Sequence, residues 1–304
     1  MAYSFRLADR TLAQGVRRIS DAQLSCALAT IADPALTLDR KVHAVRRRIK
    51  KVRALIRLIR PSLPSYTDEN RRLRDAARRL GPARDAAVML ETFDRALSRA
   101  ASPLDGDLAR RLRGRLVGAR QAMSDAEIGA ALLRTEIDLR GCHERLRDPT
   151  LTAEEAPAFE AGFARVYRRS VKMMRQARRT RDAEDIHEWR KWAKYHWLHT
   201  RLLRHAWPEG LELRSAHLDQ LTDDLGEHHD LSVLYDLLTH LLVEGEAVDT
   251  FLEASVKARL VILEARALDR GEDLFAEEPK VFARRCGAYW SVWRQNNPVS
   301  EPSA

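Results

Sequence analysis

The sequence predicts an all-α protein. Ala, Leu, Arg and Glu dominate its 304 residues, β-branched residues are sparse, and only 13 glycines are present. The dominant residues favour helices, whereas strands are enriched in β-branched residues. Apolar residues recur at helical spacing through most of the chain. Proline and glycine divide it into segments of roughly 15 to 35 residues, the size of helices in an antiparallel bundle.

Two motifs occur twice and indicate an internal duplication. The segment HAVRRRIK, which begins at His43, returns 144 residues later as HEWRKWAK, which begins at His187. The segment LGPARDAAV, which begins at Leu80, returns 145 residues later as LGEHHDLSV, which begins at Leu225. Motifs that recur in the same order at nearly the same spacing predict two structurally related halves.

The duplication sets the expected domain organisation. Farther upstream, the segment GVRR that ends at Arg18 has a counterpart, GFAR, that ends at Arg165. We therefore expect one domain over residues 1–304, made of two repeats over about 1–150 and 151–295. Each repeat is expected to hold about four helices, and residues 296–304 are expected to form a flexible tail.

The charge balance indicates an anionic partner. The chain has 53 Lys plus Arg against 44 Asp plus Glu, a formal net charge of +9. Most of the positive charge is arginine, whose guanidinium binds phosphate or carboxylate through two parallel hydrogen bonds. Nucleic acid, a phosphate polymer and an acidic membrane surface are the partner classes that fit such a chain.

A helix over residues 41–60 would carry a purely cationic face. At about 100° per residue, six basic side chains fall within about 120° of one another, along about 21 Å of the helix. They are His43, Arg46, Arg47, Lys50, Arg53 and Arg57. The opposite face is apolar and consists of Val45, Val52, Leu55, Ile56 and Ile59.

The second copy of the motif repeats this plan. Its basic face holds His187, Arg190, Lys191, Lys194 and Arg201, roughly opposite Trp189, Trp192 and Leu203. Like charges three or four positions apart repel by a few tenths of a kcal/mol per pair. A single such helix fits a solvated basic face equally well, but its recurrence at matched positions favours a bound anion. Arg18 and Arg165 complete the set of candidate anion-binding residues.

The histidines are predicted to bind phosphate rather than metal. Arg and Lys surround His43, and they would repel a cation. His228 and His229, beside Asp230, are the better metal candidates, but adjacent helical residues point about 100° apart and chelate poorly. We expect no metal and no cofactor. His43 and His187 are instead expected to donate hydrogen bonds to phosphate oxygens, with pKa values raised by the anionic ligand.

The Leu-Gly pairs at 80–81 and 225–226 are predicted to break helices, because glycine adopts the left-handed turn that ends many helices. An aspartate follows each pair, Asp85 in the first half and Asp230 in the second. A cap on the next helix is the favoured interpretation of these aspartates, and orientation of a basic side chain is the alternative.

The remaining sequence signals concern the compartment. Cys26, Cys142 and Cys286 are far apart and odd in number, so they predict neither a disulfide framework nor a metal knuckle. Residues 1–18 are charged and lack the apolar segment of a secretory signal. No run of about 18 apolar residues predicts a membrane span. We expect a cytoplasmic protein.

The two His-x-x-Arg-(Arg/Lys)-x-x-Lys segments, each followed by Leu-Gly-x-x-x-Asp, resemble the CHAD domain, the conserved histidine α-helical domain. The resemblance covers essentially the whole chain. It implies two four-helix halves with pseudo-two-fold symmetry around a basic central cavity. It also implies binding of inorganic polyphosphate, often with association with polyphosphate granules.

Carried onto this chain, the family's basic positions are His43, Arg46, Arg47, Lys50 and Arg53, and in the second copy His187, Arg190, Lys191 and Lys194. The family pattern usually continues Lys-x-x-Arg-Tyr in the second copy, where this chain has Trp197 and Leu198. Some CHAD proteins carry an N-terminal CYTH domain related to triphosphatases. Because the first CHAD-like helix starts almost at once, that module is expected to be absent.

Non-catalytic binding of polyphosphate is therefore the predicted function. A nucleic-acid-binding protein is the main alternative, because Trp189, Trp192 and Trp197 accompany the second basic helix and single-strand binders use aromatic residues. A phosphohydrolase or kinase is the weaker alternative. Such enzymes use a phosphate-binding loop or carboxylate-bound Mg²⁺, and the sequence has no Gly-x-x-x-x-Gly-Lys-Ser/Thr segment.

Overall fold

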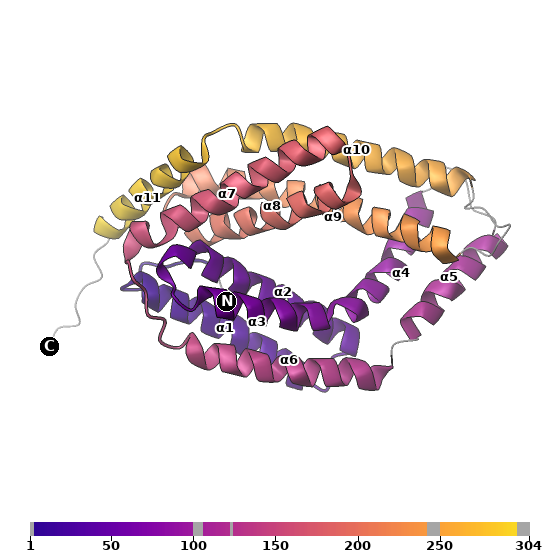
Figure 1. The fold of residues 1–304 in the computed structure, drawn as a ribbon, viewed down its shortest axis with the longest axis horizontal. Helices are drawn as coiled ribbons and strands as arrows, with labels where there is room; N and C mark the ends of the chain where they lie inside the picture. Colours follow the sequence, from indigo (N-terminus) through magenta and orange to yellow (C-terminus); the bar gives the residue numbers. More distant parts are fainter. Residues whose placement is uncertain (1–2, 100–105, 122–123, 242–249, 297–304) are drawn as a thin grey trace.

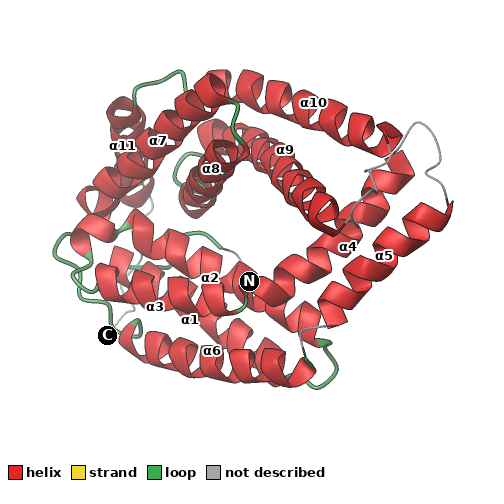
Figure 2. Cartoon of the chain, turned by 45° about the vertical axis from the view of Figure 1, so that its right-hand side comes forward, coloured by secondary structure: helices red, strands yellow, loops and turns green. Residues whose placement is uncertain are grey.

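The fold is described by a computed structural model that covers residues 3–99, 106–121, 124–241 and 250–296. Within these ranges the chain forms eleven α-helices, one short 3₁₀ helix and no strand (Figures 1 and 2). The all-α prediction is confirmed. The helices are α1 (Leu12–Ala32), α2 (Leu38–Leu58), η1 (Arg60–Ser62), α3 (Tyr66–Arg79), α4 (Gly81–Arg99), α5 (Gly106–Gln121), α6 (Asp125–Arg145), α7 (Glu155–Thr180), α8 (Ala183–Leu203), α9 (Pro208–Leu241), α10 (Thr250–Leu274) and α11 (Pro279–Gln295).

The two halves contain more helices than expected. Six α-helices precede residue 150 and five follow it, because α9 spans the stretch that the first half divides between α3 and α4. The order of the helices is compatible with a duplication, and the pseudo-two-fold symmetry stays a prediction. Of the predicted tail, only Asn296, the C-cap of α11, belongs to the described residues.

Only one of the two predicted helix breaks exists. Leu80 separates α3 from α4, whereas Leu225 and Gly226 lie inside α9, where the prediction is wrong. Neither Gly81 nor Gly226 adopts a left-handed conformation. The difference follows from the next residue: Pro82 lacks the N–H that would continue the hydrogen-bond ladder, and the second copy has a glutamate at that place.

The first basic helix, α2, begins and ends at identifiable signals. The Thr37 hydroxyl accepts a hydrogen bond from the Arg40 N–H, and Pro61 follows the C-terminus within η1. The helix thus covers residues 38–58 rather than the predicted 41–60. Its predicted apolar face is confirmed, because Val45, Val52, Leu55, Ile56 and Ile59 are all buried.

The second basic helix, α8, starts at a similar cap. The Asp182 carboxylate accepts hydrogen bonds from the backbone N–H groups of Glu184 and Asp185. Trp189 and Leu203 are buried as expected, and Trp192 is half-buried.

Close contacts hold α2 against α7 and α8. A Cβ atom on Gly162 of α7 would lie only 1.9 Å from the backbone oxygen of Leu58, so the close approach of these helices requires glycine. His199 of α8 is fully buried, and its Nε2 lies 2.9 Å from the backbone oxygen of Ala54. Burial lowers the pKa of His199 to about 3, so the ring is neutral and donates this hydrogen bond.

The halves meet a second time at the far end of the molecule. There α4 and α5 extend from the first half toward α9 and α10 (Figures 1 and 2). A separate apolar core joins them, with Phe93 of α4 and Leu234 of α9 fully buried in it. The middle of the molecule is thus framed by α2 and α4 of one half and by α8 and α9 of the other.

Cys26, Cys142 and Cys286 are all unpaired. None of the helices in the described ranges combines the length and the apolar character that crossing a membrane requires.

Candidate anion-binding site

Basic side chains from three helices converge at the middle of the molecule. We call them the basic cluster, and its members are Arg46 and Lys50 of α2, Arg84 of α4, and Arg190 and Lys194 of α8. Four of the five were predicted from the sequence. Residues that lie about 140 positions apart in the chain therefore share one site, as the repeat suggested.

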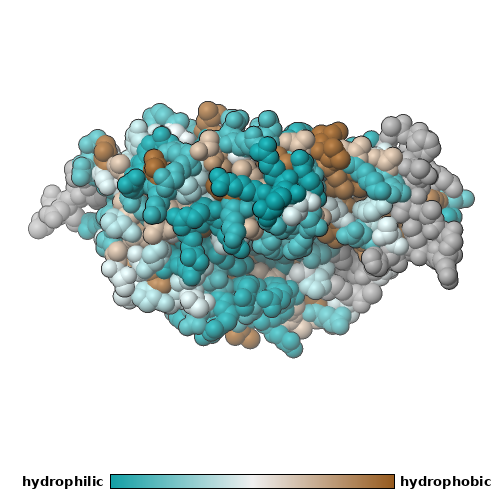
Figure 3. Space-filling model, turned by 45° about the horizontal axis from the view of Figure 1, so that its top comes forward, coloured by the Kyte–Doolittle hydropathy of each residue, from teal (hydrophilic) through white to brown (hydrophobic). Residues whose placement is uncertain are grey.

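Lys50 lies at the centre of the basic cluster. Its side chain is exposed to water, yet protein atoms crowd around it. This partial burial, together with the positive charges of the other four members, lowers the pKa of Lys50 to about 7. Hydrophilic side chains gather along the middle of the molecule on either side of a furrow (Figure 3). An anion placed among the five members of the basic cluster would stabilise each of them in its charged form.

The glycines of the two Leu-Gly motifs lie beside the arginines of the cluster. A Cβ atom on Gly81 would lie 3.5 Å from Nη1 of Arg46, and one on Gly226 would lie 3.5 Å from Nε of Arg190. The two repeated motifs thus pack against each other in the same way in both halves. Both distances are those of ordinary van der Waals contact, so the structure places the motifs beside the arginines but does not require a glycine there.

The aspartates of these motifs face the same arginines. Burial lowers the pKa of Arg46 and of Arg190, and the carboxylates of Asp85 and Asp230, respectively, oppose that shift. The predicted capping role is wrong, because Asp85 lies beyond the first turn of α4 and Asp230 lies in the interior of α9. Asp230 Oδ1 is 3.7 Å from Nη2 of Arg84, so it also connects α9 to α4.

The protein's own groups lower the pKa values of the two motif histidines. Partial burial lowers the pKa of His43, and the cations Arg47, Arg84 and Lys50 lower it further. Burial, Lys191 and Arg190 lower the pKa of His187 to about 4. The rise in pKa expected from a bound anion stays a prediction, and the anion would have to outweigh these cations.

His187 stacks on a histidine that the second Leu-Gly motif supplies. The ring centroids of His187 and His229 are 3.8 Å apart, with 30° between the planes. Burial lowers the pKa of His229 to about 3, with His187 and Arg190 as the next causes. Among the described residues, no three His, Cys, Asp or Glu side chains form a group that could hold a metal ion.

The C-terminal part of the α2 face packs on aromatic rings of α8. The guanidinium of Arg57 lies 4.4 Å from the ring centroid of Tyr195 and 5.3 Å from that of Trp192. The Asn70 side-chain oxygen accepts hydrogen bonds from Nε of Arg53, at 3.2 Å, and from Nη2 of Arg57, at 3.4 Å. The sequence did not single out Asn70 or Tyr195, because neither belongs to a repeated pair.

The basic residues of α8 already have partners within the protein. Lys194 donates a hydrogen bond of 3.1 Å to Thr222, and its Nζ lies 3.9 Å from an oxygen of Asp219. Its Nζ also lies 3.8 Å from the ring centroid of Trp197, over which Arg201 packs at 4.8 Å. Trp197, which stands where the family pattern has arginine, therefore supports two cations.

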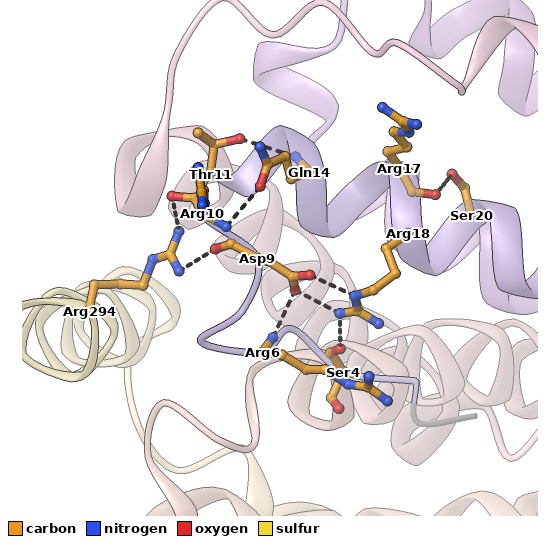
Figure 4. A network of polar contacts seen from close by, with 10 residues as sticks. All are labelled: Ser4, Arg6, Asp9, Arg10, Thr11, Gln14, Arg17, Arg18, Ser20 and Arg294. Atoms are coloured by element: carbon orange, nitrogen blue, oxygen red, sulfur yellow. Dashed lines mark hydrogen bonds and ion pairs between the residues drawn. The ribbon is translucent and has the colours of Figure 1, made fainter. Parts of the chain in front are cut away.

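Two predicted residues, Arg18 and Arg165, lie on neither of the two basic helices α2 and α8. Arg18 donates hydrogen bonds of 2.6 Å to both carboxylate oxygens of Asp9 and one of 2.9 Å to the Ser4 backbone oxygen (Figure 4). These bonds fix the N-terminal segment on α1. Arg165 lies exposed on α7.

Two comparisons identify relatives of the chain. A family model described as the CHAD domain matches residues 18–239. The crystal structure of the CHAD domain from the plant Ricinus communis has a similar fold, with a TM-score of 0.55 and 17% sequence identity. The match covers 93% of this chain and 95% of that chain. No curated protein matches the chain.

Proposed function

Because the chain belongs to the CHAD domain family, we propose that it binds inorganic polyphosphate at the basic cluster without catalysing its conversion. The convergence of four cations from three helices on Lys50 is the observation that carries this proposal. A polymer of phosphates offers closely spaced charges that arginine and lysine recognise without any contact to bases. The length of the α2 face favours a linear anion over a single phosphate.

Binding without catalysis fits the acidic residues of the site. Asp85 and Asp230 face arginines of the basic cluster, and Asp219 lies beside Lys194. These carboxylates are therefore used to hold cations in place. A phosphoryl-transfer site would instead direct its carboxylates toward Mg²⁺.

The aromatic residues disfavour nucleic acid as the partner. Proteins that bind single strands stack bases on exposed rings along a basic track. Here Arg57 covers Trp192 and Tyr195, and Lys194 covers Trp197. Rings that already bind a guanidinium or ammonium group leave less surface for a base.

Charge reversal of the basic cluster tests the proposal. In the cluster variant, Arg46, Lys50, Arg190 and Lys194 are all changed to Glu. In the control variant, four exposed arginines of α5, α6 and the following loop, Arg110, Arg134, Arg140 and Arg147, undergo the same change. We expect the cluster variant to lose at least about a thousandfold in polyphosphate affinity, since each lost charged contact contributes about 1.5 to 3 kcal/mol. The control variant should keep its affinity within about fivefold, and circular dichroism should show native helicity for both.

Two further measurements separate the alternatives. In competition at equal phosphate concentration, tighter binding of RNA or DNA than of polyphosphate would contradict the proposal. Incubation with labelled polyphosphate and Mg²⁺ should leave the chain length unchanged, and shortening would show catalysis.

We also propose that the protein associates with polyphosphate granules in the cytoplasm. A fluorescent fusion of the wild-type chain should colocalise with granules, whereas the cluster variant should be evenly distributed. Equal granule association of both proteins would contradict this part of the proposal.

A further inference from the structure

A second cationic face lies on α7, which carries no part of the basic cluster. Arg168, Lys172, Arg175 and Arg179 are all exposed. Their spacing of four, three and four residues places them within about 60° of one another, along about 16 Å of the helix. No acidic residue occurs between Ala161 and Arg181.

These four side chains form one wall of a groove, which we call the α7 groove. The other wall is the connection between α10 and α11, residues 275–279, which lies beside α7 on the outer side of the molecule (Figure 1). The groove encloses about 680 Å³ and is also lined by Val171 and Phe275. Its opposite wall carries Glu277 and Glu278.

The basic residues of α7 differ in whether the protein neutralises them. Arg178 pairs with Glu272 and Arg181 pairs with Glu264, both on α10. In contrast, no carboxylate in the described part of the chain lies within 4 Å of the side-chain nitrogens of the groove residues Arg168, Lys172 and Arg175. The described part of the chain therefore supplies no carboxylate partner to these three residues.

The groove itself keeps a positive balance. Arg179 donates a hydrogen bond to Gln176, which is a neutral amide. On the opposite wall, Glu277 is paired with Arg285 rather than with a residue of α7. Four cations thus face one carboxylate, Glu278, that has no ion-pair partner among the residues the structure describes. An anion would therefore be bound there with a net gain in electrostatic energy.

Cations also connect the groove helix to the basic face of α2. Arg169 is adjacent to Arg168 on α7, and its guanidinium lies 5.6 Å from the ring centroid of Trp192. The same ring lies beneath Arg57 of α2. Positive charge therefore continues from the α2 face across Trp192 to α7, about 100° around that helix from the groove.

We propose that the α7 groove is a second binding site for the same phosphate polymer, so that one long chain occupies the basic cluster and the groove together. The choice of ligand rests on the proposed function. Two linked sites bind a polymer more tightly than either alone, because the second contact is made within the complex. The protein would therefore discriminate long chains from short ones.

The first test counts bound tripolyphosphate by isothermal titration calorimetry. In the groove variant, Arg168, Lys172, Arg175 and Arg179 are changed to Gln. The control variant changes Arg110, Arg134, Arg140 and Arg147 to Gln and removes the same charge elsewhere. The wild type and the control should bind two equivalents, and the groove variant should bind one.

The stoichiometry separates this proposal from the proposed function. A single equivalent that the cluster variant abolishes would overturn the groove site and leave the proposed function intact. A single equivalent that the groove variant abolishes would overturn the proposed function and support the groove. Equal losses in the groove and control variants would show a general charge effect and overturn the groove site.

The second test uses long-chain polyphosphate. The groove variant should bind it about a hundredfold more weakly than the wild type, since two-site binding typically adds a factor of that order. Affinity for tripolyphosphate at the basic cluster should stay the same. An unchanged affinity for the long chain, or a groove that binds single-stranded RNA of equal phosphate number more tightly, would overturn the assignment.

Discussion

Helices α2 and α8 carry the same repeated motif but present their charge differently. On α2, His43, Arg47 and Lys50 are exposed to water. On α8, Lys191 forms an ion pair of 2.5 Å with Glu188, and Lys194 contacts Thr222. The two copies of the motif thus share the positions of their charges, whereas the surroundings of the two helices differ.

The divergence lies mainly in what each helix faces. Carboxylates of α9, from Asp219 and Asp223, favour the charged form of Lys194 on α8. Lys50 of α2 is surrounded by cations instead, and its pKa is about 7. A bound anion therefore gains more from α2 than from α8, and α2 is expected to contribute the larger part of the affinity.

Neutralising the matched lysines tests this difference and has the largest expected effect. At pH 6, where Lys50 is charged, Lys50→Gln should weaken polyphosphate binding about thirtyfold, a loss of about 2 kcal/mol. Lys194→Gln should weaken it about threefold, because Lys194 must partly give up Thr222 and Asp219 to bind the ligand. Fluorescence titration would measure both, and equal losses would remove the distinction between the helices.

The pH dependence of binding should come from α2. A bound anion raises the pKa of Lys50 above 7, so binding takes up a proton when the pH exceeds 7. Affinity should therefore fall with rising pH above about 7, by up to about tenfold per pH unit. Lys50→Arg, which stays charged, should flatten this dependence. Calorimetry in buffers of different ionisation enthalpy counts the protons, and a pH profile that Lys50→Arg leaves unchanged would contradict the mechanism.

The sequence predicts the basic residues of the site better than the side chains that hold them in place. Helical periodicity places the basic and apolar faces of α2 correctly, because both depend only on residue spacing. The convergence of Arg190 and Lys50 follows from the repeat. The partners Asn70, Tyr195 and Thr222 come from helices that meet only after folding, and no local pattern indicates such contacts.

The Leu-Gly motifs show the same limit. The sequence correctly identifies them as important, but it interprets their glycines as helix breakers. The α9 helix continues through Gly226, which has its main contact with Arg190 across the site. A Cβ atom on Gly226 would be in ordinary van der Waals contact with Arg190, so neither a turn nor a close approach requires this glycine.

The histidines extend the comparison to acid stability. The pKa values of His187 and His229 are lowered to about 4 and about 3, below the ordinary 6.5. Unfolding allows both rings to bind protons, so their contribution to stability is present above pH 6.5 and is lost progressively as the pH falls from 6.5 toward the folded-state pKa values of about 4 and about 3.

Replacing the stacked ring should reduce this acid sensitivity. Between pH 7 and pH 5, the melting temperature of the His229→Gln variant should fall less than that of the wild type, by about 2 °C. His43→Gln on α2 is the matched comparison. The pKa of His43 is also lowered, but its side chain is exposed, so the benefit should be smaller than that of His229→Gln. An equal benefit from both variants in thermal melts would show that the stacked pair has no special role.

The smallest expected effect concerns the residues that position each basic face. Asn70→Ala removes the shared acceptor of Arg53 and Arg57, which are then free to leave the geometry that faces the ligand. We expect about threefold weaker polyphosphate binding, about 0.6 kcal/mol. Thr222→Val on α9 removes the acceptor of Lys194. Affinity should stay unchanged or rise slightly, because the Thr222 oxygen no longer competes with the ligand for the N–H donors of Lys194.

These opposite signs follow directly from the difference between the helices. Asn70 holds guanidinium groups in place without neutralising them, since an amide carries no charge. Thr222 acts together with Asp219 to keep Lys194 turned toward α9. If both substitutions weaken binding equally in the same titration, the contacts of α8 orient Lys194 toward the ligand. The proposed contrast, in which the cations of α8 have partners within the protein and those of α2 are available to the ligand, would then be wrong.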